Sequence, residues 1–147
     1  MFKATLFSLL LLFISFGVQA EELKNFTLPI YGKKESFEIK KETKKYNKIL
    51  INFWASWCTA CIQELEELES LKKKHEKNGV LFVAVNAGEK RKKIKRFLKK
   101  HNFSYLILED KDRVTSKSLN ITDLPKTILI NNKMEVLFRG NRPPKKI

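Results

Sequence analysis

Cysteine and histidine are scarce in this chain of 147 residues, which contains two of each. The two cysteines, Cys58 and Cys61, can pair with each other, and no thiol is left over for a second bridge. The two histidines, His75 and His101, stand outside any metal-ligand spacing with the cysteines. Because a structural zinc ion usually has four protein ligands, a zinc site is disfavoured. We expect neither a metal nor another cofactor.

Internal repeats, low-complexity tracts and interdomain linkers are absent from the sequence, which indicates one domain. Only the amino-terminal segment is apolar enough to enter a membrane: residues 4–18 follow the single charge of Lys3. This run of 15 residues falls short of the ~20 that span a bilayer, and small residues follow it, as in a secretory signal. We therefore predict a signal peptide at residues 1–20, cleaved after Ala20, and a domain at residues 21–147. Retention of the segment as a membrane anchor is the alternative.

Acidic residues are few relative to basic ones: the chain has 16 Asp and Glu against 30 Lys and Arg, a net charge of +14. The positive charge gathers at residues 40–48 and 90–100. Ile94, Phe97 and Leu98 are spaced for a one-sided helix, which predicts a basic outer face. Such a face is ordinarily just solvated; an anionic membrane surface or an acidic protein partner is the alternative. No nucleic-acid-binding motif is recognised, and we expect no nucleic-acid partner.

Alternating apolar runs and helical periodicities predict an α/β fold with a mixed sheet. The runs at residues 49–54 and 80–85 are apolar almost throughout, which is typical of strands buried on both faces. They should be parallel neighbours, because a helix predicted at residues 59–77 separates them and stops at Asn78-Gly79. The other predicted elements are a hairpin at residues 26–30 and 36–39, a helix at 89–101, an apolar stretch at 105–108, a short helical piece at 113–119, and strands at 127–130 and 135–138.

A Cys-x-x-Cys pair lies between the first of these strands and the helix that follows it, within residues 54–61 (WASWCTAC). At a helix start, unsatisfied backbone N–H groups and the positive end of the helix dipole favour a thiolate over a thiol. Cys58 is therefore predicted to be the nucleophile of a redox site, and Cys61, one turn further on, its resolving thiol. A structural disulfide is the alternative, although a bridge that closes so short a loop removes little entropy from the unfolded chain.

Glu64 is the candidate proton-transfer group of this site. At ~100° per residue, the predicted helix places Glu64 in the same arc as Cys58 and Cys61. Glu66 and Glu67 point away from that arc. A carboxylate in this position can exchange a proton with the resolving thiol. Other charged residues also fall inside the arc, so an ordinary, partly exposed helix glutamate is the alternative.

Two motifs together resemble one family. Residues 52–61 (NFWASWCTAC), followed about sixty residues later by residues 124–127 (LPKT), resemble the secreted thioredoxin-like proteins of the TlpA and ResA type. The similarity covers about residues 26–140. It implies a thioredoxin-like fold, in which a mixed central sheet is flanked by helices and preceded by an amino-terminal β-hairpin.

The resemblance also implies roles for residues near the cysteines. Pro125 is expected to be a cis-proline that faces the disulfide, with the backbone of Leu124 pairing with an extended substrate as an added strand. Trp57 is expected in an exposed apolar rim for that substrate. Glu64 corresponds to an active-site acid of ResA-like proteins, and Asn52 stands where cytosolic thioredoxins carry a buried aspartate.

The chain departs from the family pattern at three places. Ala60 precedes the second cysteine where the family often has proline, and the residues between the cysteines tune the redox potential. Lys126 follows Pro125 where the cytochrome-c-maturation branch has glutamate. Residues 141–147 are too few and too rich in proline for the usual carboxy-terminal helix. One sheet face is therefore expected to be covered by something else, such as a second copy or a membrane partner.

The function that the resemblance implies is a periplasmic thiol-disulfide oxidoreductase that acts mainly as a reductase. Its substrates would be disulfides or thiols of exported proteins, such as apocytochrome c, and a membrane thiol donor would regenerate the reduced form. A copper-handling protein, in which the reduced dithiol delivers or protects thiols for copper assembly, is the alternative. A peroxidase is disfavoured, because Cys58 lacks the Thr-x-x-Cys setting of peroxiredoxins.

Overall fold

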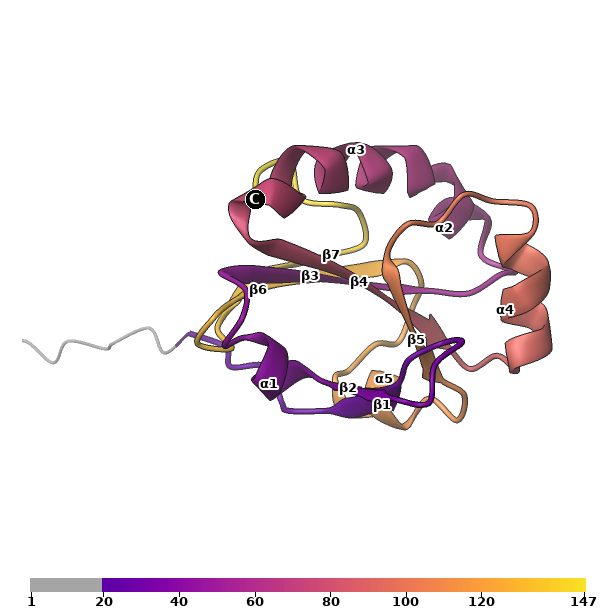
Figure 1. Cartoon of the computed structure of the whole chain (residues 1–147), viewed down its shortest axis with the longest axis horizontal. Coiled ribbons are helices and arrows are strands. Elements are labelled where there is room, and N and C mark those ends of the chain that lie inside the picture. Colours follow the sequence, from indigo (N-terminus) through magenta and orange to yellow (C-terminus); the bar gives the residue numbers. More distant parts are fainter. Residues whose placement is uncertain (1–19) are drawn as a thin grey trace, which may run out of the picture.

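A mixed five-stranded sheet forms the centre of the computed structural model, which describes residues 20–147 (Figure 1). The strands lie in the order β5-β4-β3-β6-β7. Their bounds are β3 (Lys48–Trp54), β4 (Val80–Ala87), β5 (Leu106–Asp110), β6 (Lys126–Asn131) and β7 (Val136–Gly140). β3, β4 and β5 run parallel. β6 pairs antiparallel with β3, and β7 pairs antiparallel with β6. The parallel pairing predicted for residues 49–54 and 80–85 is confirmed.

β3 is buried on both faces because it lies in the middle of this sheet. Ile49, Ile51 and Phe53 point into one apolar cluster, and Leu50 and Trp54 point into another on the opposite face. All five side chains are at most 1% exposed. A strand in this position needs apolar residues at successive positions, which explains the nearly continuous apolar run, broken only by Asn52.

Three helices and one short 3₁₀ turn lie on one face of the sheet: α2 (Thr59–Gln63), α3 (Leu65–His75), η1 (Glu76–Asn78) and α4 (Arg91–Leu98). Figure 1 shows α3 lying along this face and α4 standing at its end. The prediction of a single helix at residues 59–77 is wrong in one respect, because the observed helix is interrupted at Glu64. The stop at Gly79 is confirmed, since Gly79 adopts a left-handed φ of 76° that favours glycine.

The opposite face carries the amino-terminal hairpin and two short helices. β1 (Thr27–Pro29) and β2 (Ser36–Glu38) pair as the predicted hairpin, with α1 (Ile39–Glu42) and α5 (Val114–Ser118) in the same layer (Figure 1). The sequence did not predict α1. Ile39, predicted to end the second hairpin strand, instead begins a helical turn that buries its side chain completely.

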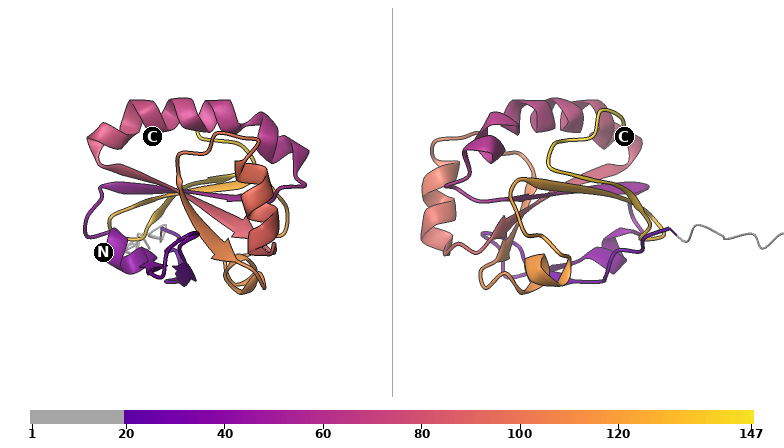
Figure 2. Two further views of the ribbon diagram at one scale, coloured as in Figure 1. Left: turned by 45° about the vertical axis from the view of Figure 1, so that its right-hand side comes forward. Right: turned by 180° about the vertical axis from the view of Figure 1, so that it is seen from behind.

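The carboxy-terminal segment, residues 141–147, covers part of the sheet face on which α3 lies. Figure 2 shows it leaving β7 and folding back between the sheet and α3. Pro143 and Pro144 are buried, and Ile147 packs against the apolar cluster beneath α3. The segment contains no helix, as predicted. The chain's own residues therefore cover part of this face, and cover of the remainder by a second copy or a membrane partner stays a prediction.

Residues 1–19 lie outside the described part of the chain, and the predicted signal peptide falls there apart from Ala20. Within residues 20–147, no helix is long and apolar enough to cross a membrane. Export, cleavage and anchoring therefore stay predictions.

Removing residues 143–147 should expose the apolar surface that the carboxy-terminal segment covers. We expect the free energy of unfolding to fall by about 2 kcal/mol, because two buried prolines and part of Ile147 are lost. The loss is measured by urea unfolding, and binding of an apolar dye should increase. The control variant, Lys145→Ser with Lys146→Ser, changes only exposed side chains of the same segment. An unchanged urea midpoint after truncation would contradict the covering role.

Candidate active site

Cys58 and Cys61 form a disulfide at the start of α2, directly after the end of β3. Cys58 caps the helix, and its Sγ accepts a hydrogen bond of 3.2 Å from the backbone N–H of Cys61. The loop between strand and helix is closed by a bond from the Cys58 N–H to the carbonyl of Ala55. Both cysteines are nearly buried, at 4% and 3% exposed, while the neighbouring Trp57 is 65% exposed. The N–H aimed at Cys58 favours its thiolate when the disulfide is reduced.

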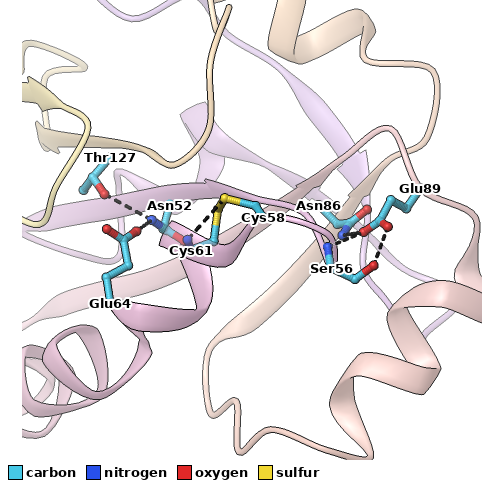
Figure 3. The surroundings of a disulfide bond; sticks show 8 residues. All are labelled: Asn52, Ser56, Cys58, Cys61, Glu64, Asn86, Glu89 and Thr127. Carbon is cyan, nitrogen blue, oxygen red and sulfur yellow. Dashed lines mark hydrogen bonds between the residues drawn. A yellow bond between two sulfur atoms is a disulfide. The ribbon is translucent and has the colours of Figure 1, made fainter.

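Glu64 is buried at the junction of α2 and α3, where only 7% of it is exposed. Asn52 of β3 donates from Nδ2 to Oε1 of Glu64 at 2.9 Å and to the hydroxyl of Thr127 in β6 at 3.1 Å. Figure 3 shows this group on the Cys61 side of the disulfide. Glu64 has φ −91° and ψ −1°, and the helix is interrupted at this residue. The predicted inward position of Glu64 is present.

Burial raises the pKa of Glu64 from 4.5 to about 7. The hydrogen bond from Asn52 and the positive charge of Arg142 act in the opposite direction, and the negative charge of Glu67 adds to the increase. A carboxyl group with this pKa exists in both protonation states near neutral pH. It can therefore accept or donate a proton within the physiological range.

Glu89, which the sequence motifs do not single out, is a buried carboxylate on the other side of the disulfide (Figure 3). Its Oε2 accepts from the backbone N–H of Ser56 at 2.7 Å and from Nδ2 of Asn86 at 2.9 Å, and its Oε1 accepts from the Ser56 hydroxyl at 2.5 Å. Burial raises the pKa of Glu89, but these hydrogen bonds outweigh burial and hold it below its ordinary value. Glu89 thus fixes the loop that precedes Cys58.

One signal in the sequence could have revealed Glu89. Asn86 and Glu89 lie at and just beyond the end of β4, and Ser56 follows the end of β3. Carboxyl ends of neighbouring parallel strands meet at one edge of a sheet, so polar residues there are brought together.

Leu124 and Pro125 lie just before β6, and the peptide bond between them is cis, as the resemblance implies. Leu124 is half-buried against both apolar clusters, and Pro125 is buried. Pro125 and Glu64 line the same pocket of about 120 Å³, together with Ala60 and Arg142. The structure thus places Pro125 beside the predicted acid.

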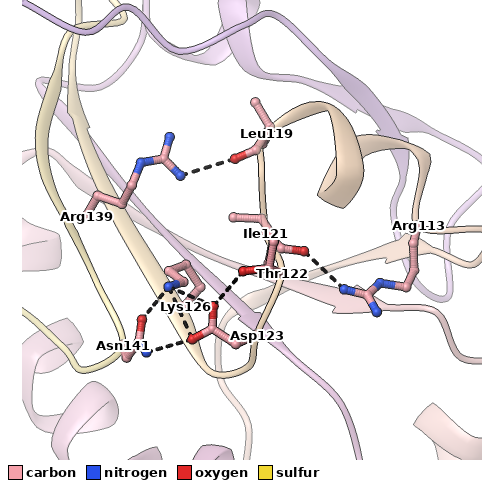
Figure 4. A network of polar contacts seen from close by, with 8 residues as sticks. All are labelled: Arg113, Leu119, Ile121, Thr122, Asp123, Lys126, Arg139 and Asn141. Atoms are coloured by element: carbon pink, nitrogen blue, oxygen red, sulfur yellow. Dashed lines mark hydrogen bonds and ion pairs between the residues drawn. The ribbon is translucent and has the colours of Figure 1, made fainter.

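Polar contacts hold the loop that carries Leu124 and Pro125 (Figure 4). Asp123 accepts a hydrogen bond of 2.6 Å from Asn141 and forms an ion pair of 3.1 Å with Lys126, which also donates to Asn141. Two arginines fix the loop from outside: Arg113 donates to the carbonyl of Ile121 at 3.1 Å, and Arg139 donates to the carbonyl of Leu119 at 3.2 Å. The loop is therefore held at both its ends.

No group of three or more His, Cys, Asp or Glu residues in the described part of the chain is arranged to hold a metal ion. The groups that gather around the disulfide are instead amides, hydroxyls and two carboxyls. This set suits proton transfer and positioning of a dithiol or disulfide.

Residues 19–146 match the family described as Redoxin, and the chain belongs to that family. Over 89 residues the chain is 29% identical to the thiol-disulfide oxidoreductase ResA of Bacillus subtilis, a match that covers 60% of this chain and 50% of that protein. ResA of Geobacillus kaustophilus is 31% identical over 88 residues, with coverage of 60% and 51%. The matches thus span about half the length of these curated relatives.

Solved structures also resemble this one. A thiol-disulfide oxidoreductase from Bacteroides fragilis is 26% identical with a TM-score of 0.75, covering 85% of this chain and 93% of that chain. A thiol:disulfide interchange protein DsbE from Chlorobium tepidum has the same TM-score of 0.75 at 24% identity, covering 85% and 86%. These matches confirm the thioredoxin-like fold and the resemblance to proteins of the ResA type.

Replacing Glu64 with Gln should make the protein more stable at alkaline pH relative to the wild type. The raised pKa means that wild-type stability is fully present below pH 4.5 and is lost as pH rises through about 7. The advantage of Glu64→Gln should therefore grow by about 3 kcal/mol between pH 4 and pH 8. Urea unfolding of the two oxidised proteins across this range measures it. Glu66→Gln, an exposed position in α3 two residues further on, is the control. A pH-independent difference would show that the pKa of Glu64 is ordinary.

Replacing Glu89 with Ala should destabilise the oxidised protein by about 2–4 kcal/mol, because the buried donors of Ser56 and Asn86 lose their acceptor. Glu89→Gln keeps one oxygen for these donors, and the Ser56 hydroxyl can turn to accept from the new amide. The free energy of unfolding should therefore fall less than half as much in Glu89→Gln as in Glu89→Ala. Chemical denaturation compares the three proteins; equal losses for both variants would mean that the charge, and not the hydrogen bonds, matters.

Proposed function

We propose that this protein is a thiol-disulfide oxidoreductase that reduces disulfides of exported proteins in the periplasm, with apocytochrome c among its substrates. The observation that carries this proposal is the combination of a nearly buried Cys58–Cys61 disulfide with Glu64, a buried acid whose pKa is about 7. A structural disulfide needs no such acid, whereas thiol exchange needs a proton acceptor near neutral pH. The names of the ResA and DsbE relatives support the same activity.

The reaction begins with the reduced dithiol. The Cys58 thiolate attacks one sulfur of the substrate disulfide, forming a mixed disulfide and releasing the other substrate sulfur as a thiolate that takes up a proton. Cys61 then transfers its proton to the Glu64 carboxylate and attacks the Cys58 sulfur. This step releases the second substrate thiol and leaves Cys58 and Cys61 as a disulfide. Two electrons pass from protein to substrate, and a membrane thiol donor restores the dithiol.

Substrate binding is proposed at the rim of the disulfide. The exposed Trp57 supplies apolar surface on one side, and the loop of Leu124 and Pro125 supplies backbone on the other. The network around Asp123 supports this loop, so an extended substrate would meet a fixed edge. The proposed location rests on residues 1–20 acting as the export signal.

A single-turnover experiment tests the two steps separately. Reduced protein is mixed with a peptide disulfide, and formation of the mixed disulfide and release of the peptide thiol are followed from pH 6 to 9. Cys61→Ser should accumulate the mixed disulfide without release. Glu64→Gln should slow release by about tenfold near pH 7, because Cys61 loses its proton acceptor. Wild-type release should rise with pH through about 7, as the Glu64 carboxyl ionises.

Glu66→Gln is the matched control, since it removes an exposed carboxylate from the neighbouring helix α3 and should leave release unchanged. Absence of any mixed disulfide with Cys61→Ser would overturn the oxidoreductase proposal. Equal release by wild type and Glu64→Gln at every pH would remove Glu64 from the reaction but not the cysteines. Stoichiometric, tight Cu(I) binding by the reduced protein without peptide reduction would favour the copper-handling alternative.

A further inference from the structure

The outer side of α4 and the turn after it form a strongly basic surface. Its exposed cations are Lys92, Lys93, Lys95, Arg96, Lys99 and Lys100, which we call the basic face. Among residues 20–147, the one α4 cation that forms an ion pair is Arg91, at 2.6 Å from Glu109. Ile94 and Phe97 are buried against the sheet, so the helix is anchored with its cations pointing outward. None of the six cations of the basic face forms an ion pair within the described residues, although the charge of Lys93 lowers the pKa of Glu89.

A groove connects this basic face to the disulfide loop. It has a volume of about 280 Å³ and is lined by Ser56, Lys93, Arg96, Phe97, Lys100 and His101. The rings of Phe97 and His101 stack at 4.4 Å and provide its apolar side. Ser56, held by Glu89, lies two residues before Cys58. The groove therefore begins at the loop that precedes the reactive cysteine.

Arg96 also lines a second hollow, of about 310 Å³, whose other walls are Lys92, Lys95 and Lys99. The positive surface is consequently continuous from Ser56 along α4. Beyond Lys100 the neighbouring groove is lined by Glu66 and Glu69 as well as lysine, so the purely basic surface ends there. The side of the site near Glu64 is also mixed in charge. The cations therefore gather on one approach to the disulfide.

We propose that the basic face and its groove dock an acidic segment of the protein whose disulfide is exchanged at Cys58. This inference rests on the oxidoreductase function proposed above. The lysine and arginine side chains of the basic face would bind the carboxylate groups of this segment. A groove that leads to the reactive cysteine suits an extended polypeptide better than a flat membrane surface. An eight-residue helix is about 12 Å long, which an extended peptide spans in about four residues, so a run of about four acidic residues near the substrate cysteine can follow it.

Two disulfide peptides test the docking of acidic segments. One carries four glutamates within eight residues of a cysteine, and the other carries glutamine at the same positions. We expect the reduced protein to react about tenfold faster with the acidic peptide at low ionic strength, because opposite charges speed encounter. The ratio of the two rate constants should fall towards one in 0.5 M salt, where such charges are screened.

Arg96→Glu with Lys100→Glu should abolish or invert the ratio. The control, Lys44→Glu with Lys117→Glu, makes the same change in net charge at exposed positions after α1 and in α5, on the opposite layer, and should keep the preference. Equal rates for both peptides with the wild type would overturn the docking inference and leave the oxidoreductase function standing. Reduction of neither peptide would overturn the proposed function and this inference with it.

A membrane surface is the competing partner for the same cations. Vesicles of phosphatidylcholine with about 30% phosphatidylglycerol provide the probe, and cosedimentation measures binding. Vesicle binding that Arg96→Glu with Lys100→Glu abolishes, combined with equal rates for the two peptides, would assign the basic face to a membrane and overturn the proposal. A peptide preference without vesicle binding would support it.

Discussion

The hydrogen bond between Asn52 and Glu64 connects the central strand of the sheet to the helix that follows the disulfide. Asn52 interrupts the apolar row of β3 on the face between Leu50 and Trp54, and it also bonds to Thr127 of the neighbouring strand. A buried amide without partners is costly, so the surrounding groups must supply them. Glu64 accepts from this amide at the point where the helix is interrupted, one turn beyond Cys61.

The two buried carboxyl groups beside the disulfide differ in how many donors they receive. Burial raises the pKa of both, because each loses contact with water. Glu64 receives one hydrogen bond and remains protonatable near pH 7, whereas Glu89 receives three and stays ionised. Glu64 can therefore move a proton, while Glu89 fixes the loop before Cys58. The number of donors, together with the charges of Glu67 near Glu64 and Lys93 near Glu89, separates the pKa values of the two carboxyl groups.

Most of the sheet and part of the site could be predicted from the sequence. The strands at the centre were found because continuous apolar runs mark strands that are buried on both faces, and Glu64 was found by its helical phase relative to Cys58. The interruption at Glu64 was missed because a change at one residue leaves the periodicity almost intact. Glu89 was missed because its contact with Ser56 spans 33 residues and exists only once two strand ends meet. Local sequence patterns therefore predict which residues are buried, but they do not predict which distant polar residues form hydrogen bonds.

The carboxy-terminal segment shows how covering a sheet can also affect a site. Within residues 141–147 no helix follows β7, and the segment instead buries Pro143 and Pro144 against the sheet. It also brings Arg142 and Pro143 to the pocket that Glu64 lines. The positive charge of Arg142 lowers the pKa of Glu64, against the effect of burial. A segment without helical or strand periodicity thereby influences the proton affinity of the central acid. Neither the Cys-x-x-Cys motif nor the distant proline motif contains this segment, so the proton affinity of Glu64 depends on residues outside the motifs that carry the family resemblance.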